Sequence, residues 1–347
     1  MNNIIELNFS KPSKNVPNFG IELLKTIIFF FILVYHCYDQ KLNENKILDI
    51  ILDAIPLYYP TLFLIYFYFS YNHLSNKNLP QLHKRFLKLI VPYIIWPLIF
   101  FIINYLSTDK RTEKYSLYDL FVQLTIGRGI ACVFWYQFNL LIINIIFCLI
   151  IFPFKKQHLY LFYSILLILF CLEYFNVFEK LFFSCSENIK RSVGRLARMT
   201  IFSIIGFILS SYKILIFLKD YRIISMCISF IFSFIILYFK IYISEKYFYE
   251  GIFEILSSIS FFIFFYMLPF EKITFGPLIF LIKQITSYSS GIYYMHIKII
   301  EYFQDYFKAF EEKTLTGCTI NYIICYFICF IGMKTFGKTN LKYLFIR

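Results

Sequence analysis

The sequence is poor in charged residues. Only 16% of its 347 residues are charged and 59% are hydrophobic, whereas soluble globular proteins contain about 25% charged residues. This composition excludes a soluble globular domain. It predicts an all-α polytopic membrane protein, because backbone groups surrounded by lipid must be hydrogen-bonded within helices or closed barrels.

The sequence also lacks the short motifs of several enzyme classes. It contains no GxSxG, HExxH, Walker A or GxGxxG pattern. The nine cysteines are scattered and show neither a disulfide framework nor metal-ligand spacing, so no metal is expected. The net charge of +13 fits basic loops beside anionic lipid headgroups, and no motif indicates a nucleic-acid partner.

What the sequence does contain is a series of apolar runs. About ten segments reach the length of a membrane span, which predicts a bundle of about ten transmembrane helices. They are Gly20–Tyr38, Asp53–Tyr71, Phe86–Leu106, Cys132–Phe152, Leu159–Phe175, Met199–Leu218, Arg222–Ile243, Ile252–Phe270, Tyr288–Tyr306 and Gly317–Phe336.

These spans organise the chain into a polar N-terminus, residues 1–18, and a single transmembrane domain, residues 19–347. We expect residues 1–18 to be flexible and the first span to be retained rather than cleaved. An even number of spans places both termini on one side, which we take as cytoplasmic, although Lys and Arg are almost evenly divided between the two sides. The basic loop Asn176–Arg198 then lies outside, which indicates either a wrong topology or a surface for an anionic acceptor.

The first span, FGIELLKTIIFFFILVYHCY, carries Glu22, Lys25 and His36. Ionisable groups within a membrane helix are costly and commonly mark functional sites. Lys25 and His36 lie on one helix face, about 16 Å apart along the axis, which suggests a polar path across the bilayer. Alternatively, Glu22 and Lys25 form a local ion pair and His36 is an interfacial histidine.

A basic cluster, His83, Lys84, Arg85 and Lys88, directly precedes the third span. Arg85 and Lys88 share a helix face, and with Lys25 they could hold a polyphosphate through charge-assisted hydrogen bonds. The alternative is ordinary anchoring at the inner membrane face.

Two further groups are candidates for lining a cavity. His296 lies in the ninth span close to Lys298 and Glu301, and either a structural or a catalytic role fits it. Trp135 and Tyr136 open the fourth span, where they could line a cavity or belong to an interfacial aromatic belt.

Several of these stretches resemble the acyltransferase-3 family of membrane O-acyltransferases. GIELLKTIIFFFILVYHC resembles the family's first helix, an acidic residue, a basic residue, ten residues and a histidine. RFLKLIVPYIIW resembles its third-helix entrance, with Lys88 in place of the second arginine. VFWYQFNLL, RMTIFSIIGFILS and SGIYYMH resemble three later motifs. The resemblance extends over nearly the whole chain. One departure is Tyr66 and Phe67, where the family has a Ser-Gly pair.

The resemblance implies transfer of an acetyl or other acyl group from cytoplasmic acetyl-CoA to a hydroxyl of an extracytoplasmic or lipid-linked glycan. His36 would be the base or nucleophile, Glu22 would orient Lys25, and Lys25, Arg85 and Lys88 would bind the donor. The pantetheine arm is comparable in length to the ~16 Å between Lys25 and His36. Two alternatives remain: a transporter of an organic acid or lipid-linked sugar without covalent chemistry, and a degenerate family member acting as a scaffold.

Overall fold

The computed structural model describes residues 18–38, 59–106, 114–130, 132–154, 158–174, 187–243, 252–269, 276–304, 308–311 and 314–346. Within these residues the chain is helical and contains no strand, which confirms the all-α prediction. Of the predicted flexible N-terminus, only Asn18 falls within the described residues, where it caps the first helix.

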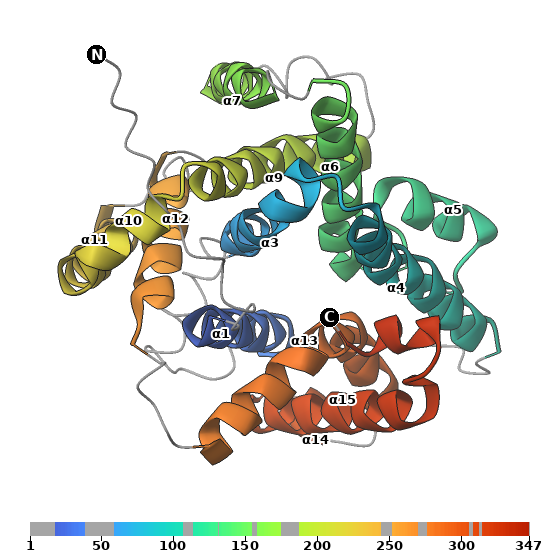
Figure 1. Cartoon of the computed structure of the whole chain (residues 1–347). Coiled ribbons are helices and arrows are strands. Elements are labelled where there is room, and N and C mark those ends of the chain that lie inside the picture. Colours follow the sequence, from blue (N-terminus) through green and yellow to red (C-terminus); the bar gives the residue numbers. More distant parts are fainter. Residues whose placement is uncertain are drawn as a thin grey trace, which may run out of the picture.

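The helices form a bundle around a central group, α1, α3, α6 and α13, with α7 at its periphery (Figure 1). In chain order they are α1 (Phe19–Cys37), α3 (Tyr59–Ser75), α4 (Leu79–Leu106), α5 (Leu117–Ile126), η2 (Cys132–Phe134), α6 (Trp135–Ile151), α7 (His158–Tyr174), α9 (Glu187–Ser211), α10 (Ile214–Asp220), α11 (Arg222–Ile243), α12 (Ile252–Met267), α13 (Gly276–Phe303), α14 (Lys308–Glu311), α15 (Leu315–Phe336) and η5 (Asn340–Leu344).

Each predicted span overlaps at least one of these helices, but several predicted boundaries are wrong. α4 and α13 are 28 residues each and begin earlier than predicted, so Arg85 and Lys88 lie inside α4. The predicted loop Ser107–Ala131 contains α5. α9 begins at Glu187, within the predicted loop Asn176–Arg198. The basic residues of this segment therefore belong to the helix. Apolar residues between them form a stripe that packs on the bundle, so the helix continues beyond the apolar run.

Contacts between the helices fix their relative directions. α1 and α13 are parallel, since Thr26 contacts Thr286 at one level (oxygens 2.5 Å apart) and His36 contacts His296 further along both helices. α12 is antiparallel to α1, because the Asn18 amide at the start of α1 donates to the Tyr266 carbonyl near the end of α12 (3.1 Å). These directions agree with α1, α12 and α13 as the first, eighth and ninth of successive membrane crossings.

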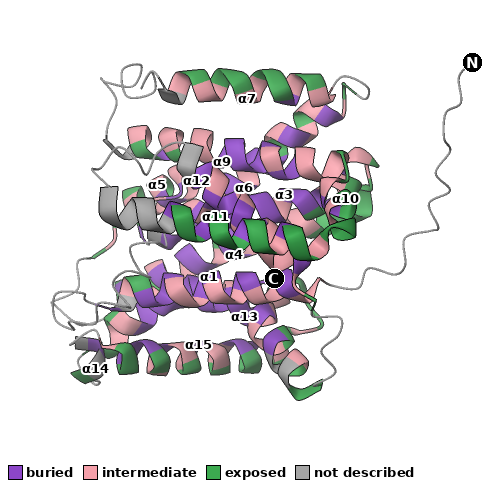
Figure 2. Cartoon of the chain, turned by 90° about the vertical axis from the view of Figure 1, so that its left-hand side faces the viewer, coloured by how far each residue is buried: buried purple, intermediate pink, exposed green. Residues whose placement is uncertain are grey.

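Burial separates a shared interior from a peripheral face. In Figure 2, α7 and α11 expose much of their length, whereas the central helices are largely buried. Four helical stretches within the described residues are long and apolar enough to cross a membrane: Phe19–His36, Leu79–Leu106, Ile189–Ser211 and Leu315–Phe336. Exposed Ile and Phe side chains on α11 fit a lipid-facing surface, since lipid requires no polar outer face.

Candidate active site

Two histidines from distant parts of the chain meet inside the bundle. His36 in the last turn of α1 and His296 in α13 have ring centroids 5.4 Å apart, with the ring planes inclined by 40°. His296 is fully buried, with 0% of its surface exposed, and His36 is half-buried. The structure thus brings together two side chains that the sequence identified separately. We call them the histidine pair.

The hydrogen bonding of His296 defines its tautomer when the ring is neutral. Its Nδ1 lies 2.7 Å from the Tyr293 carbonyl oxygen, which can only accept, so Nδ1 carries the proton. Nε2 is then an acceptor. It is buried and has no hydrogen-bond partner among the described residues, and an unsatisfied buried polar atom of this kind is uncommon. The Asn321 amide donates to the His296 carbonyl (2.9 Å), which fixes the backbone.

Two aromatic rings lie beside the histidine pair, Tyr35 next to His36 (5.5 Å) and Tyr293 next to His296 (5.9 Å). The Tyr293 hydroxyl donates to the Val133 carbonyl (2.7 Å), and its ring lies 5.7 Å from the Tyr136 ring. Tyr136 is buried, so its ring packs inside the bundle rather than in an interfacial belt. Trp135, the first residue of α6, lies beside Phe63 (6.5 Å, stacked) and under the guanidinium of Arg195 (5.0 Å).

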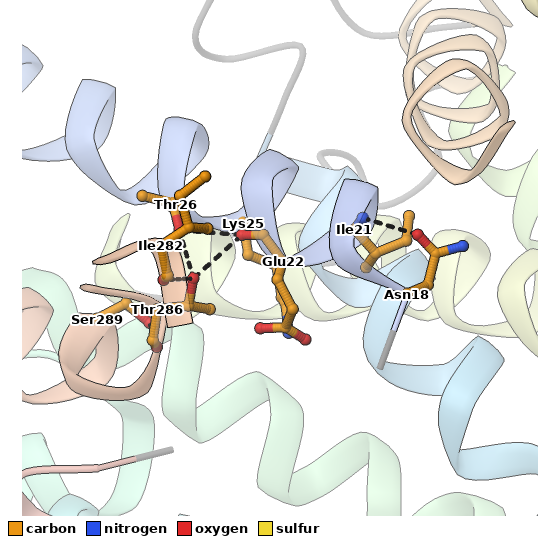
Figure 3. A network of polar contacts seen from close by, with 8 residues as sticks. All are labelled: Asn18, Ile21, Glu22, Lys25, Thr26, Ile282, Thr286 and Ser289. Atoms are coloured by element: carbon orange, nitrogen blue, oxygen red, sulfur yellow. Dashed lines mark hydrogen bonds and ion pairs between the residues drawn. The ribbon is translucent and has the colours of Figure 1, made fainter. Parts of the chain in front are cut away.

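Near the start of α1, Glu22 and Lys25 form an ion pair. Lys25 is only 8% exposed, and Figure 3 shows the two side chains extending from α1 in the same direction. On the neighbouring face, Thr26 and Thr286 join α1 to α13 (2.5 Å). The local pair that the sequence allowed is therefore present, and it neutralises a lysine in a region where an uncompensated charge would be costly.

Arg85 anchors the start of α4 to the end of α3. Its guanidinium donates to the Ser70 hydroxyl and to the Phe69 carbonyl (3.2 Å) and lies over the Tyr66 ring (5.4 Å). Lys88, one turn further along α4, is exposed.

Arg85 and Lys25 lie at one end of the bundle. Tyr68, beside the Arg85 contacts on α3, packs against Tyr266 of α12 (5.8 Å), and the Tyr266 carbonyl accepts from Asn18 at the start of α1. We call this the basic end, and the opposite end, with His36 and His296, the histidine end.

One stripe of α1 connects the two ends. Glu22, Lys25, Phe29 and His36 fall within about 60° around the helix axis, and Lys25 and His36 are about 16 Å apart along it. Phe29 contacts Tyr293 of α13 (5.7 Å) midway. The stripe that carries the ionisable groups therefore faces α13, so these groups face protein rather than lipid.

The departure from the family pattern at Tyr66 and Phe67 has a structural explanation. Tyr66 lies under the Arg85 guanidinium, and Phe67 is fully buried against the Phe147 ring (4.5 Å). The close approach to α9 comes instead from Gly206, whose α-carbon faces the backbone of Leu64. The aromatic pair thus packs against α4 and α6, whereas the close approach of α3 and α9 depends on Gly206.

Sequence reasoning did not single out Tyr293 or Asn321, and it identified Arg195 only as part of a basic loop that could be a surface for an anionic acceptor. The tyrosine and the amide lie in apolar spans, where a polar side chain is itself a signal. Arg195 was assigned to a loop, and only the extension of α9 places it over Trp135.

These features define a polytopic helical membrane protein with a histidine pair at one end and a lysine and an arginine at the other. A family model described as an acyltransferase domain matches residues 18–334, and the chain belongs to this family, acyltransferase-3. The expected resemblance is confirmed, and membrane acyltransferase activity is the function of this class. Searches of curated proteins and of solved structures give no match.

Proposed function

We propose that this protein transfers an acetyl or similar acyl group from acetyl-CoA to a hydroxyl of an extracytoplasmic or lipid-linked glycan, across the cell membrane and with both termini cytoplasmic. The histidine pair carries the proposal, because it places an imidazole with a buried partner inside a membrane-spanning bundle. Imidazole is the commonest general base in enzymes and can also act as a nucleophile.

The basic end is suited to the phosphates of the donor. Arg85 carries a planar guanidinium, a group that can bind phosphate in a two-pronged manner, and Lys88 carries a compact positive charge. Lys25 lies on the stripe that leads to His36, with Glu22 orienting it. A donor whose phosphates occupy this end would reach along Phe29 and Tyr293 with its pantetheine arm and bring its thioester close to His36, about 16 Å away.

His36 would then act in one of two ways. As a base it takes the proton of the acceptor hydroxyl while that oxygen bonds to the thioester carbon, the carbon–sulfur bond breaks, and the thiolate leaves and is protonated. As a nucleophile its nitrogen first receives the acyl group and releases CoA, and the acceptor hydroxyl then displaces the imidazole. Both routes need a neutral His36 ring and yield the same products.

His296 would position His36. Two imidazoles joined by an N–H···N bond of about 2.9 Å have centroids about 5.2 Å apart, close to the 5.4 Å observed. The described residues provide no hydrogen bond at Nε2 of His296, but at this separation Nε2 would be able to accept the His36 N–H and leave the other His36 nitrogen unprotonated and able to react. A hydrogen bond at one ring nitrogen determines which nitrogen of a catalytic histidine carries the proton.

The test compares His36→Ala with His83→Ala, an exposed histidine on α4, in protein reconstituted with membrane lipids. We expect acceptor-dependent release of CoA from labelled acetyl-CoA to fall at least about 100-fold for His36→Ala, the effect of losing a general base, and to be unchanged for His83→Ala. His296→Gln, which keeps an acceptor, should retain more activity than His296→Leu.

Glycan acetylation that persists in cells carrying His36→Ala, at unchanged protein abundance, would refute the role of His36. Transport of an organic acid or lipid-linked sugar by the wild-type protein, without release of CoA, would replace the transferase with the transporter alternative.

A further inference from the structure

Pro92 removes a hydrogen bond from the middle of α4. A proline has no backbone N–H, so the carbonyl four residues earlier, that of Lys88, loses its usual helical partner. In a membrane helix a carbonyl of this kind must be satisfied by a neighbouring element. The bond is missing in the turn that directly follows Arg85, which is part of the basic end.

Gln137 of α6 supplies a donor to this turn. Its side-chain amide donates to the Leu89 carbonyl (3.0 Å) and, over a longer distance, to the Lys88 carbonyl (3.4 Å). Gln137 is only 2% exposed, and a polar side chain buried within membrane helices commonly marks a functional position. The proline of one helix and the glutamine of its neighbour therefore form a matched pair.

Tyr294 of α13 holds the other side of the Gln137 amide. Its hydroxyl donates to Gln137 Oε1 (2.5 Å), and its ring stacks on Phe134 (5.6 Å). Tyr294 precedes His296 by two residues in the same helix. One buried amide thus joins the turn of α4 near the basic end to the helix that carries His296.

The two halves of α4 have separate anchors on either side of Pro92. In the second half, the Tyr93 hydroxyl donates to the Gln123 carbonyl (2.7 Å), and the Trp96 indole donates to a carbonyl of η5. The first half is held by the contacts of Arg85 with α3 and by the bond from Gln137. Of these two anchors, the bond from Gln137 is the one that leads to α13.

We propose that Gln137 is a positioning residue for the acyl donor, which sets the first half of α4 at a fixed distance from the histidine pair. This inference rests on the proposed function, in which the donor phosphates bind at the basic end and the thioester lies close to His36. A donor that spans both regions binds well only when their separation matches its own length. Without the Gln137 amide, the first half of α4 can shift relative to α13, and the donor can no longer reach both regions at once.

The test compares two probes of different reach, acetyl-CoA and adenosine 3′,5′-bisphosphate. The bisphosphate resembles the phosphorylated nucleoside of CoA and lacks the pantetheine arm. Calorimetry on purified protein in neutral detergent measures both dissociation constants without turnover. We expect Gln137→Leu to weaken acetyl-CoA binding about five-fold, the effect of one lost hydrogen bond, and to leave the affinity for the bisphosphate unchanged.

The prolines of α4 provide a rescue and its matched control. Pro92→Ala restores an N–H for the Lys88 carbonyl, so in this background Gln137→Leu should weaken acetyl-CoA binding only about two-fold. Pro97→Ala, in the same helix, restores an N–H for the Tyr93 carbonyl instead. In that background the loss should remain about five-fold.

Tyr294→Phe is a milder variant for the case in which Gln137→Leu does not fold. It keeps the ring beside Phe134 and removes the hydroxyl that orients Gln137, so acetyl-CoA binding alone should weaken, by about two-fold. Unchanged acetyl-CoA binding in both variants would overturn the positioning role, as would equal weakening of the two probes. An effect of Gln137→Leu that is the same in the Pro92→Ala and Pro97→Ala backgrounds would also overturn it.

Failure of the proposed function would give a different pattern. Selective weakening of acetyl-CoA binding by Gln137→Leu, in a protein that releases no CoA, would contradict the transferase and leave the positioning role intact. Release of CoA by the wild type, with unchanged donor affinity in Gln137→Leu, would do the reverse. A wild-type protein that binds neither probe would overturn both.

Discussion

Replacement of Gly206 by alanine tests the packing that holds α9 against the rest of the bundle. A β-carbon at this position would lie 2.2 Å from the Leu64 carbonyl oxygen and 3.0 Å from the Leu64 carbonyl carbon and α-carbon. All three are backbone atoms of α3 and cannot rotate away. The two helices would have to separate by about 1.2 Å to restore ordinary contact at about 3.4 Å.

The cost of this separation follows from what lies around the contact. Phe67 on α3 and Phe207 on α9 are fully buried, and a gap of about 1 Å forfeits up to about half of the dispersion energy of each contact that opens. Overpacking of a well-filled core costs about 1–3 kcal/mol. Alanine recovers up to about 1 kcal/mol of helix propensity relative to glycine, so we expect a net loss of stability.

The same helix supplies the matched control. A β-carbon at Gly194 would meet nothing within 4 Å, so Gly194→Ala should be neutral or stabilising by up to about 1 kcal/mol. The half-life of both variants at a fixed elevated temperature in detergent measures the difference, because membrane proteins of this size commonly unfold irreversibly. Equal half-lives for Gly206→Ala and wild type, or equal loss in both variants, would refute the close approach of α3 and α9.

Two further predictions concern cations, the half-buried Arg85 and the buried Lys298. Arg85→Lys keeps the charge but cannot reproduce the two-pronged contact with Ser70 and the Phe69 carbonyl. We expect the KM for acetyl-CoA to rise about five-fold, because one hydrogen bond between residue 85 and the donor phosphates is lost. An unchanged KM would argue against donor binding by Arg85. Lys298, 3% exposed, donates to the Tyr115 hydroxyl (2.5 Å) and pairs with Glu301, whose side chain is 46% exposed. Lys298→Met should therefore lower the thermal stability by about 1–3 kcal/mol. Glu301→Gln should lower it by less, since water solvates the Glu301 carboxylate. If a melting experiment gives the reverse order, the hydrogen bond to Tyr115 is the weaker of the two contacts of Lys298.

The membrane class and the positions of the helices followed from the sequence. Long apolar runs separated by polar segments predict spans directly, because length and hydropathy are local properties. The boundaries were less accurate where a helix continues into polar sequence. α9 extends to Glu187 through four basic residues, and α4 begins at Leu79, because a helix that packs on its neighbours needs only one apolar stripe outside the bilayer.

Part of the site was also contained in local sequence. The spacing of Glu22, Lys25 and His36 places them on one stripe of a single helix, whatever surrounds that helix. The family motifs likewise occupy short stretches of sequence. By contrast, local sequence could not decide between a cavity and an interfacial belt for Trp135 and Tyr136, since either environment suits an amphipathic aromatic ring.

The sequence by itself determined the helical membrane class, the order of the spans and the face of α1 that carries ionisable groups, because each depends on the periodicity and hydropathy of neighbouring residues. Only the tertiary structure decided that His36 meets His296, that Arg195 lies over Trp135, and that Gly206 lets α9 approach α3. These contacts join residues distant in the chain, and they depend on how side chains of different helices interlock, which no local pattern specifies.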